Sequence, residues 1–425
     1  MPRINLFVFA AHHLSSNVAA ERFKGLLKYL DPGKYRIFVF ARQASSAASA
    51  KAMPSQPGMR IIALPGQCVG SESSAHASLL TLASAFVRPL PFLVPGDHGQ
   101  AKSWLVQALA EADRLCRERV AAGEHCVAIG TYSPIDSLIA ASSLASRYGI
   151  GCMQDFRDGL VFEALGKPGR LRNLLRTLIE RRVVENSGLI TSVSGPLVDD
   201  FRRRYPHKDA KVLPNGFDPA DFERLAGDAD GVRRANAILA EHVPAGATLV
   251  GHFGRIGASD GSASLSLDYL VDALNRSGAA SSGKHVMFVG ELTDGERATI
   301  GRAKFPVSVI PPVERSVALQ LMRRCDKLLL LTGSRVSCAT GKLFDYLATG
   351  ADVVCVTRVW NAATVILRET GAGRALLADD GAAGAEGLSD ALFGAGGDAR
   401  HDISAYNRIV QAGQLDNWIS RMVMA

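Results

Sequence analysis

The stretch LLLLTGSRVSCATGKLFDYLATG, from Leu328 to Gly350, decides the fold. An apolar run is followed by a loop of small and polar residues, and the loop leads into a helix that opens near Gly341 and has one apolar face. A strand that is apolar throughout and continues into a helix is typical of a parallel sheet covered by helices on both faces. This stretch therefore predicts an α/β fold.

The start of that helix carries two candidate ligand-binding residues. Lys342 lies at the helix N-terminus, where unpaired N–H groups and the positive end of the helix dipole favour phosphate oxygens. Asp345, one turn further along, could accept hydrogen bonds from sugar hydroxyls. A second interpretation also fits, in which both residues only cap and solvate the helix start.

The same alternation of strand and helix extends through both halves of the chain. Helical spacing recurs over Ser16 to Leu30, Leu267 to Asn275 and Val317 to Arg323. Short apolar runs separate such segments: INLFVFA, RIFVFA, MRIIAL, HCVAIGTY, GLITSVS and AKVLPNG in the first half, and ATLVGHFG, HVMFVG, VSVIPPV, KLLLLTGS and DVVCVT in the second. We therefore predict two doubly wound parallel sheets, with ligands bound beyond the carboxyl ends of their strands.

Domain boundaries follow from changes in composition. We predict a first domain over residues 1–215, a second over 216–400, and a C-terminal helix in 401–425 that returns toward the first domain. The polar segment Asp218 to Ala247 is the expected inter-domain region, and the small residues of Ala378 to Gly397 resemble a loop or linker. The cleft between the two sheets is the expected binding site.

Composition narrows the functional classes. The chain has 425 residues, of which 47% are hydrophobic and 21% charged, which is typical of a folded globular protein. A net charge of +7 permits an anionic partner. Seven scattered cysteines without a CxxC pair favour a reducing, cytoplasmic compartment, and no metal-ligand spacing is visible, so we expect no metal. The apolar stretch Thr81 to Val94 contains prolines and is too short to span a membrane.

Two more strand ends in the second half carry candidate residues. LVGHFGRIG, from Leu249 to Gly257, places Arg255 where its guanidinium could clamp an oxyanion, unless it only forms a surface ion pair. VSVIPPV, from Val307 to Val313, has prolines that could present backbone groups to a flat base, or could form an ordinary loop.

The ordered set of motifs resembles a known family. SSNVAAERFKGLLKYL, DFRDGL, SVSGPLVDDF, VLPNGFDPADF, HFGRIG, MFVG, IPPV and GKLFDYLATG are similar in order to a GT-B-fold, retaining glycosyltransferase of family 4, of the bacterial surface-polysaccharide type. The resemblance covers about Phe9 to Gly373. It implies transfer of a sugar from a nucleoside diphosphate to a glycan or lipid-linked glycan, without a cofactor or metal.

The resemblance also implies roles for individual residues. Arg255 and Lys342 would be catalytic, by stabilising the leaving diphosphate. The nucleotide-binding residues would be Gly254, Arg255, Val313, Gly341, Lys342 and Asp345, with Val313 at the base and Asp345 at the ribose. The acceptor side of the cleft would include Ser15, Ser16, Asn17, Asp155, Arg157 and Asp158. The last three could instead form a structural Asp–Arg network, and His12 and His13 are either ligand contacts or packed strand-end residues.

Two departures from the family pattern keep an alternative open. Asp260 stands where members commonly have a lysine, and Ser337 replaces the first of two acidic residues, of which Asp345 is the second. Lys342 could supply the missing cation. The alternative is a catalytically silent GT-B protein that binds a nucleotide sugar or a partner glycosyltransferase. A sugar-nucleotide epimerase on the same architecture would need acid and base residues that cannot be assigned.

A basic amphipathic segment suggests a further partner. Lys167 to Arg182 combines six cations with leucines at helical spacing, so it could lie on an anionic membrane surface as part of a peripheral protein, with the apolar Phe86 to Val94 adding to the contact. A helix whose apolar stripe is buried in the core is the other interpretation. Nucleic acid is not expected as a partner, because the cations are not interleaved with stacking aromatic residues.

Overall fold

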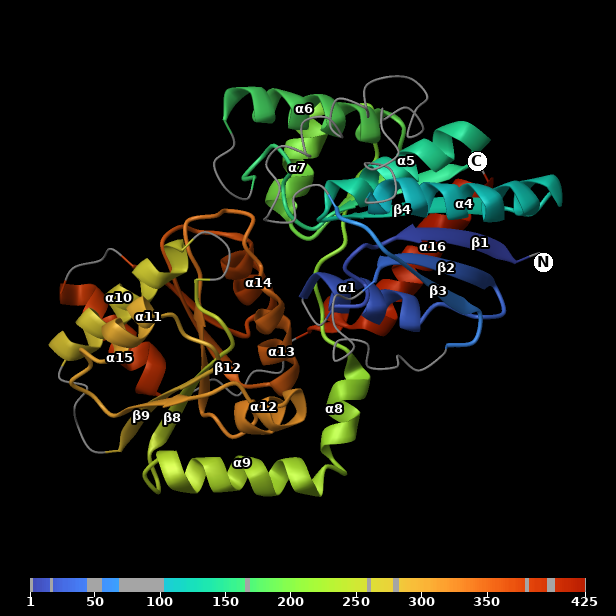
Figure 1. Ribbon diagram of the computed structural model, residues 1–425. Helices are drawn as coiled ribbons and strands as arrows, with labels where there is room; N and C mark the ends of the chain where they lie inside the picture. Colours follow the sequence, from blue (N-terminus) through green and yellow to red (C-terminus); the bar gives the residue numbers. More distant parts are fainter. Residues whose placement is uncertain are drawn as a thin grey trace. The chain divides into compact units, whose positions relative to one another are not determined.

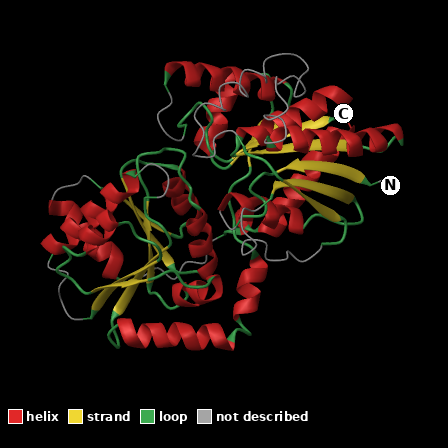
Figure 2. Cartoon of the chain, viewed as in Figure 1, coloured by secondary structure: helices red, strands yellow, loops and turns green. Residues whose placement is uncertain are grey.

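The protein consists of two compact units, Met1–Pro214 with Arg408–Ala425, and Asn215–Asn407. The computed structural model describes residues 3–15, 18–43, 56–68, 103–164, 169–257, 261–277, 283–378, 382–395 and 402–424. In each unit helices pack on a central sheet (Figures 1 and 2).

The first unit contains a seven-stranded parallel sheet in the order β3-β2-β1-β4-β5-β6-β7. Its strands are β1 (Ile4–Phe9), β2 (Tyr35–Arg42), β3 (Met59–Leu64), β4 (Cys126–Tyr132), β5 (Gly151–Phe156), β6 (Leu189–Ser192) and β7 (Ala210–Val212). β1 and β4 are buried along their whole length, because helices cover both faces of the sheet.

The helices of the first unit form two layers around this sheet. They are α1 (Val18–Lys28), α4 (Trp104–Ala121), α5 (Ile135–Tyr148), α6 (Arg170–Glu185), α7 (Gly195–Arg204) and α16 (Arg408–Met424). One apolar cluster joins the sheet to α4 to α7, and another joins it to α1 and α16 (Figure 1). The C-terminal helix α16 therefore completes the core of the first unit, although the chain has by then passed through the second.

The second unit contains a six-stranded parallel sheet in the order β10-β9-β8-β11-β12-β13. Its strands are β8 (Thr248–Phe253), β9 (Lys284–Val289), β10 (Val307–Ile310), β11 (Lys327–Leu331), β12 (Asp352–Thr357) and β13 (Gly373–Leu377). Its helices are α8 (Pro219–Leu225), α9 (Ala229–His242), α10 (Ser262–Arg276), α11 (Asp294–Ile300), α12 (Arg315–Met322), α13 (Gly341–Thr349), α14 (Ala362–Thr370) and α15 (Ala382–Phe393), with a short 3-10 turn, η2 (Ser404–Tyr406).

Two local predictions from the sequence were wrong. Most of the segment Asp218 to Ala247 is not a connector but forms α8 and α9, which pack on α12 within the second unit. The stretch Ala378 to Gly397 contains α15, whose Leu388 and Leu392 are fully buried beside α10. Both segments are rich in alanine, which is the best helix former but gives little apolar periodicity to recognise.

The strand order of each sheet reverses direction once, and this reversal positions the candidate sites. The reversal lies between β1 and β4 in the first unit and between β8 and β11 in the second. Loops that leave the carboxyl ends of neighbouring strands at such a point diverge to opposite faces, and a crevice opens between them. Ligand-binding residues are therefore expected directly after β1, β4, β8 and β11.

Candidate functional site

Beside the reversal point of the second unit, two glycines approach each other closely at the carboxyl ends of β8 and of its other neighbour, β9. Gly254 ends β8 with φ of 80°, and Gly290 ends β9 with φ of 147°. A Cβ atom on Gly290 would lie 2.9 Å from the Cα of Gly254, so a side chain there would push the two strand ends apart. The close approach thus requires glycine at position 290, and the positive φ favours glycine at position 254, the first glycine of HFGRIG.

Lys342 reaches across this point from the second residue of α13. Its Nζ lies 3.2 Å from Nε2 of His252 on β8 and donates a hydrogen bond to the carbonyl oxygen of Arg255. The structure therefore brings Lys342 next to the backbone of Arg255, as the motif order predicts, but not next to its guanidinium. His252 is a member of this group that the sequence analysis missed, and its only signal is a polar residue inside the buried strand ATLVGHFG.

Lys342 is a cation that forms no ion pair with a carboxylate among the residues the structure describes. It is half-buried. Desolvation lowers the pKa of its ammonium group to about 8, although the charges of Cys338 and Glu296 oppose the shift. The N-terminus of α13 adds partial positive charge, and the hydroxyl of Thr340 beside it has no partner in the described structure. This group of donors is suited to an anion.

Arg255 itself points to another partner. Its guanidinium donates to one carboxylate oxygen of Glu291, from Nε at 3.0 Å and from Nη2 at 2.5 Å, and both side chains are exposed. The carboxylate raises the pKa of Arg255, which therefore stays charged. Without a ligand, Arg255 is neutralised by its neighbour after β9.

Asp345 is also paired. Both of its carboxylate oxygens accept hydrogen bonds from Arg315 on α12, at 2.9 and 3.1 Å, and Arg315 also donates to Asp221 of α8 at 2.8 Å. A ribose contact by Asp345 would have to share these oxygens with Arg315. Val313, two residues before Arg315, is half-buried against the core of the second unit. Asp260 lies outside the described residues.

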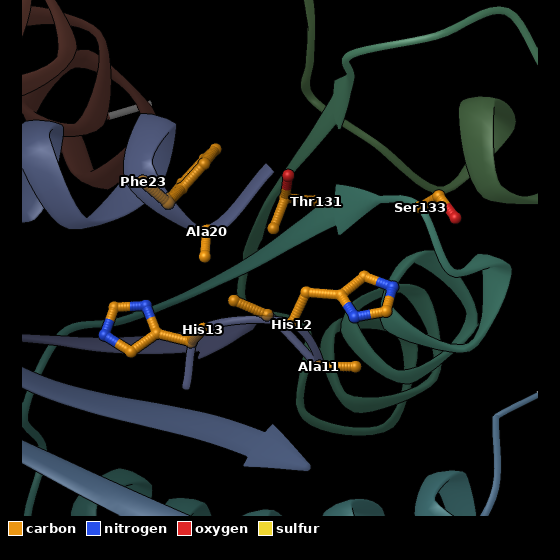
Figure 3. Close-up of a pocket in the computed structure, with 8 residues that line it drawn as sticks. Ala11, His12, His13, Ala20, Phe23, Thr131 and Ser133 are labelled. Atoms are coloured by element: carbon orange, nitrogen blue, oxygen red, sulfur yellow. The ribbon is translucent and has the colours of Figure 1, made fainter. Parts of the chain in front are cut away.

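The reversal point of the first unit contains a small pocket beyond β1 and β4. His12, His13, Ala20 and Thr131 are among its lining residues (Figure 3). His13 is 1% exposed, and neither ring nitrogen has a hydrogen-bond partner among the described residues. Burial, with a contribution from Lys24, lowers the pKa of His13 to about 4, so its ring is neutral at physiological pH.

Of the residues predicted at the acceptor side, Asp155 belongs to the core. It is fully buried and accepts hydrogen bonds from Arg22 at 2.8 Å, Thr131 at 3.1 Å and Thr191 at 2.8 Å. Arg22 also donates to the carbonyl oxygens of Leu213 and Pro214, so this network ties α1 and β5 to the end of the first of the unit's two segments. Asp155 thus belongs to a buried Asp–Arg network whose arginine is Arg22, while Arg157 pairs with Asp158.

Three of the other predicted acceptor residues, Ser15, Arg157 and Asp158, lie near the strand ends. Arg157 and Asp158 form an ion pair with each other at 2.7 Å in the loop after β5. Ser15 donates to the carbonyl oxygen of His12 at 2.8 Å, and its own carbonyl accepts from Lys24. Ser16 and Asn17 lie outside the described residues.

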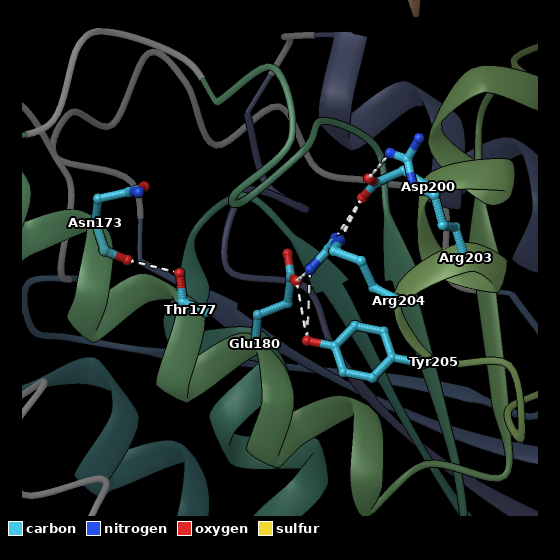
Figure 4. A network of polar contacts seen from close by, with 7 residues as sticks. All are labelled: Asn173, Thr177, Glu180, Asp200, Arg203, Arg204 and Tyr205. Carbon is cyan, nitrogen blue, oxygen red and sulfur yellow. Dashed lines mark hydrogen bonds and ion pairs between the residues drawn. The ribbon is translucent and has the colours of Figure 1, made fainter.

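Helix α6 is anchored to α7 through its buried side. Glu180 is fully buried, burial raises the pKa of its carboxyl group, and it accepts hydrogen bonds from Arg204 and from the hydroxyl of Tyr205 (Figure 4). The opposite side of α6 is open: Leu171, Leu174 and Leu178 are 63%, 55% and 38% exposed. These three leucines lie outside the core, whereas Ile179 of the same helix is buried within it, so the core interpretation holds for part of the apolar residues.

In the ranges given above, no group of three or more His, Cys, Asp or Glu side chains is arranged to hold a metal ion. Among the helices that the structure describes, none is long and apolar enough to cross a membrane. The stretch Phe86 to Val94 and Lys167 are not among the described residues.

Comparison with known proteins identifies the fold. A glycosyltransferase from Rickettsia africae is similar over 99% of this chain and 98% of its own, with a TM-score of 0.61 and 9% identity. An α,α-trehalose-phosphate synthase (UDP-forming) from Burkholderia vietnamiensis is similar over 99% and 98%, with a TM-score of 0.57 and 13% identity. A structure from E. coli, described as trehalose-6-phosphate bound with UDP-2-fluoro glucose, is similar over 99% and 96%, with a TM-score of 0.55 and 13% identity.

A putative UDP-N-acetylglucosamine 2-epimerase from Listeria monocytogenes has a similar structure too, with a TM-score of 0.53 and 10% identity over 98% of this chain and 95% of its own. No family model and no curated protein matches the sequence. At such low identities the likeness shows the fold alone. The fold is GT-B, as the motif order predicts.

Proposed function

We propose that this protein is a retaining glycosyltransferase of family 4 that moves a sugar from a nucleoside diphosphate donor to a glycan or lipid-linked glycan acceptor. The observation that carries the proposal is Lys342, a half-buried cation at a helix N-terminus with no carboxylate partner in the described structure. A half-buried charge without a counterion is costly, and an anionic ligand would supply the missing charge. The diphosphate of a sugar nucleotide is such a ligand.

The chemistry follows from how these donors are fixed. As the bond between the sugar and the diphosphate breaks, negative charge grows on the leaving group, and Lys342, Arg255 and the N–H groups of α13 stabilise it. The acceptor hydroxyl attacks the sugar carbon from the face that the diphosphate leaves, and its proton passes to the departing phosphate oxygen. No protein nucleophile takes part in this scheme. The protein contributes orientation and preorganised positive charge.

Direct binding of nucleotides tests the proposal. Thermal shift with UDP, GDP, ADP and TDP, followed by calorimetry on the tightest, should give one nucleotide that binds the wild type and binds Lys342→Met weakly. Lys284→Met is the matched control, because Lys284 is a lysine of the same unit that lies at the amino end of β9. If no nucleoside diphosphate or sugar nucleotide binds the folded wild type, the proposal is wrong.

The same material separates transfer from the alternatives. A transferase releases nucleoside diphosphate from its sugar nucleotide, and release rises with the correct acceptor. A catalytically silent protein binds the nucleotide sugar and returns it intact. An epimerase inverts a stereocentre of the sugar and returns it still bonded to the nucleoside diphosphate. Analysis of the recovered nucleotide by chromatography therefore distinguishes the three.

The exposed residues of α6 support an anionic membrane surface as a proposed partner. Leu171, Leu174 and Leu178 repeat at i, i+3 and i+7 on its open side. Arg170, Arg181 and Arg182 are exposed and have no ion-pair partner among the described residues. An exposed apolar stripe flanked by cations matches the acyl chains and anionic headgroups of a lipid surface, where each cation contributes about 1 kcal/mol.

Sedimentation with vesicles tests this partner. The wild type should bind vesicles that contain phosphatidylserine or phosphatidylglycerol, and salt should weaken the binding. Reversing the charges of Arg170, Arg181 and Arg182 together should release the protein. The matched control reverses Arg224, Arg233 and Arg234 of the second unit, which changes net charge equally. Equal binding of both triple variants would exclude α6 as the contact.

A further inference from the structure

His252 is a buried polar residue beside Lys342 that takes no part in the proposed chemistry. It lies on β8, is fully buried, and packs its ring against Phe288 of β9, with ring centroids 5.8 Å apart. Its two ring nitrogens face different partners. Nδ1 lies 3.0 Å from the carbonyl oxygen of Leu329 on β11, and Nε2 lies 3.2 Å from Nζ of Lys342.

These two contacts determine where the ring carries its proton. A carbonyl oxygen can only accept, so Nδ1 must be the donor, and Nε2 is left with its lone pair. An ammonium group can only donate, so Lys342 donates to Nε2. Both contacts therefore require the tautomer with its proton on Nδ1. The carbonyl oxygen of Leu329 on β11 stabilises this tautomer. Burial and the nearby charge of Lys342 lower the pKa of His252 well below its usual value, so the ring stays neutral.

We propose that His252 is a positioning residue, which holds the ammonium group of Lys342 at the carboxyl end of β8 by accepting its hydrogen bond through Nε2. The role rests on the proposed function, because it matters only if Lys342 binds an anion. Lysine has a long, flexible side chain, and its freedom must be lost whenever it binds a ligand. Two fixed acceptors, Nε2 of His252 and the carbonyl oxygen of Arg255, remove that freedom beforehand and leave the third N–H for the ligand.

The groups around Lys342 determine how a substitution of His252 should change the pKa of the Lys342 ammonium group. His252 faces it from β8, Glu296 acts on it from α11, and Cys338 acts on it from the loop before α13. The guanidinium of Arg255 is engaged by Glu291. Removing the Nε2 acceptor leaves the same burial but one hydrogen bond fewer for the ammonium group, so Lys342 should lose its proton at lower pH.

Three variants test the proposal. His252→Phe keeps a buried ring without an acceptor, and His252→Gln offers an amide oxygen near the position of Nε2. His285→Phe is the matched control, because His285 is a buried histidine on the neighbouring strand β9 that contacts Ser308 instead. Circular dichroism and thermal unfolding establish that each variant is folded.

Calorimetry with UDP between pH 6.5 and 9.5 provides the first measurement. Affinity of the wild type should fall above about pH 8, as Lys342 loses its proton. His252→Phe should bind about tenfold more weakly at pH 7.5, the loss expected for one hydrogen bond to a charged group, and its affinity should fall at lower pH. His252→Gln should recover part of the affinity and part of the pH dependence of the wild type. His285→Phe should match the wild type in both properties. Equal affinity and an equal pH profile in His252→Phe would overturn the proposal.

Nitrogen NMR of the ligand-free protein provides a measurement that needs no nucleotide. The His252 ring should show a protonated Nδ1 and an unprotonated Nε2, and the Nζ signal of Lys342 should titrate at lower pH in His252→Phe. A wild type that binds no nucleotide but shows these signals would refute the proposed function and leave the hydrogen bond intact. An Nε2–H tautomer, or a Lys342 titration that does not move, would refute the positioning role.

Discussion

Arg255 and Glu291 form an exposed ion pair across the carboxyl ends of β8 and β9, with the guanidinium Nη2 2.5 Å from the carboxylate. Arg255 is the residue that the motif order assigns to a diphosphate. Glu291 therefore occupies the same guanidinium that a ligand would use. A ligand must either displace this carboxylate or bind beside it, and the pair opposes binding of an anion in both cases.

Glu291→Gln should bind nucleoside diphosphates more tightly than the wild type. The substitution removes a negative charge beside the ligand and frees Arg255, and we expect a gain of roughly two- to fivefold, the size typical of an exposed pair. Calorimetry at low salt measures it. Asp230→Asn is the control, because Asp230 is an exposed carboxylate paired with Arg233 on α9. Weaker binding of Glu291→Gln would mean that Glu291 itself contacts the ligand.

Arg255→Ala and Lys342→Ala should each lower turnover by about 100-fold or more, comparable with the loss of one preorganised donor to a developing oxyanion. Lys342→Arg should recover only part, because a guanidinium cannot reproduce the position of the ammonium group. Activity should survive chelation of divalent metals. Steady-state kinetics with the sugar nucleotide and its acceptor measure these effects, and near-normal turnover in Lys342→Ala would contradict the proposed role.

Asp345→Ala should raise the KM for the sugar nucleotide about tenfold while kcat changes little, since a ribose contact is present before and during transfer. Asp221→Ala is a sharp control. Asp221 also pairs with Arg315, so both variants remove one carboxylate from the same guanidinium, but only Asp345 lies on α13. Equal kinetic effects of the two variants would show that Asp345 acts only through Arg315.

His13 should make the first unit sensitive to acid. In the folded protein its pKa is about 4, against 6.5 for an exposed histidine, so only the unfolded chain takes up a proton between these values. Stability should therefore fall as the pH falls from 6.5 to 4, by up to about 3 kcal/mol from this residue. Urea unfolding of His13→Leu should show a smaller loss over this range. The control is the exposed His125→Leu, which should keep the wild-type dependence.

Breaking the buried ion pair of Arg22 and Asp155 should strongly lower the stability of the first unit. Asp155→Asn leaves the Arg22 guanidinium buried without its counterion, and we expect a loss of about 3–5 kcal/mol in the free energy of unfolding. The double variant Arg22→Met with Asp155→Asn should recover part of this loss. Urea unfolding followed by circular dichroism measures both, with the exposed pair of Arg114 and Glu118 as a control whose removal should change little.

The sequence by itself determined the architecture, because apolar runs and helical spacing depend on neighbours along the chain. INLFVFA and KLLLLTGS are apolar on both faces and become buried parallel strands, and the helix expected near Gly341 begins at that residue. GCMQDF, which becomes β5, was not recognised as a strand, because Gln154 and Asp155 interrupt its apolar pattern. Their polar side chains are buried only because other elements supply hydrogen-bond partners.

Some features of the candidate site could likewise be predicted from the sequence, and others only from the tertiary structure. Arg255, Lys342 and Asp345 could be selected from the sequence because each follows a strand within a motif. Their partners could not, because His252 lies 90 positions from Lys342, Glu291 lies 36 from Arg255, and Arg315 lies 30 from Asp345. Only the strand order places β8 beside β9 and β11, and this order decides which charges remain open to a ligand. Local sequence determines which side chains stand at the strand ends, and tertiary structure decides their ionisation and their partners.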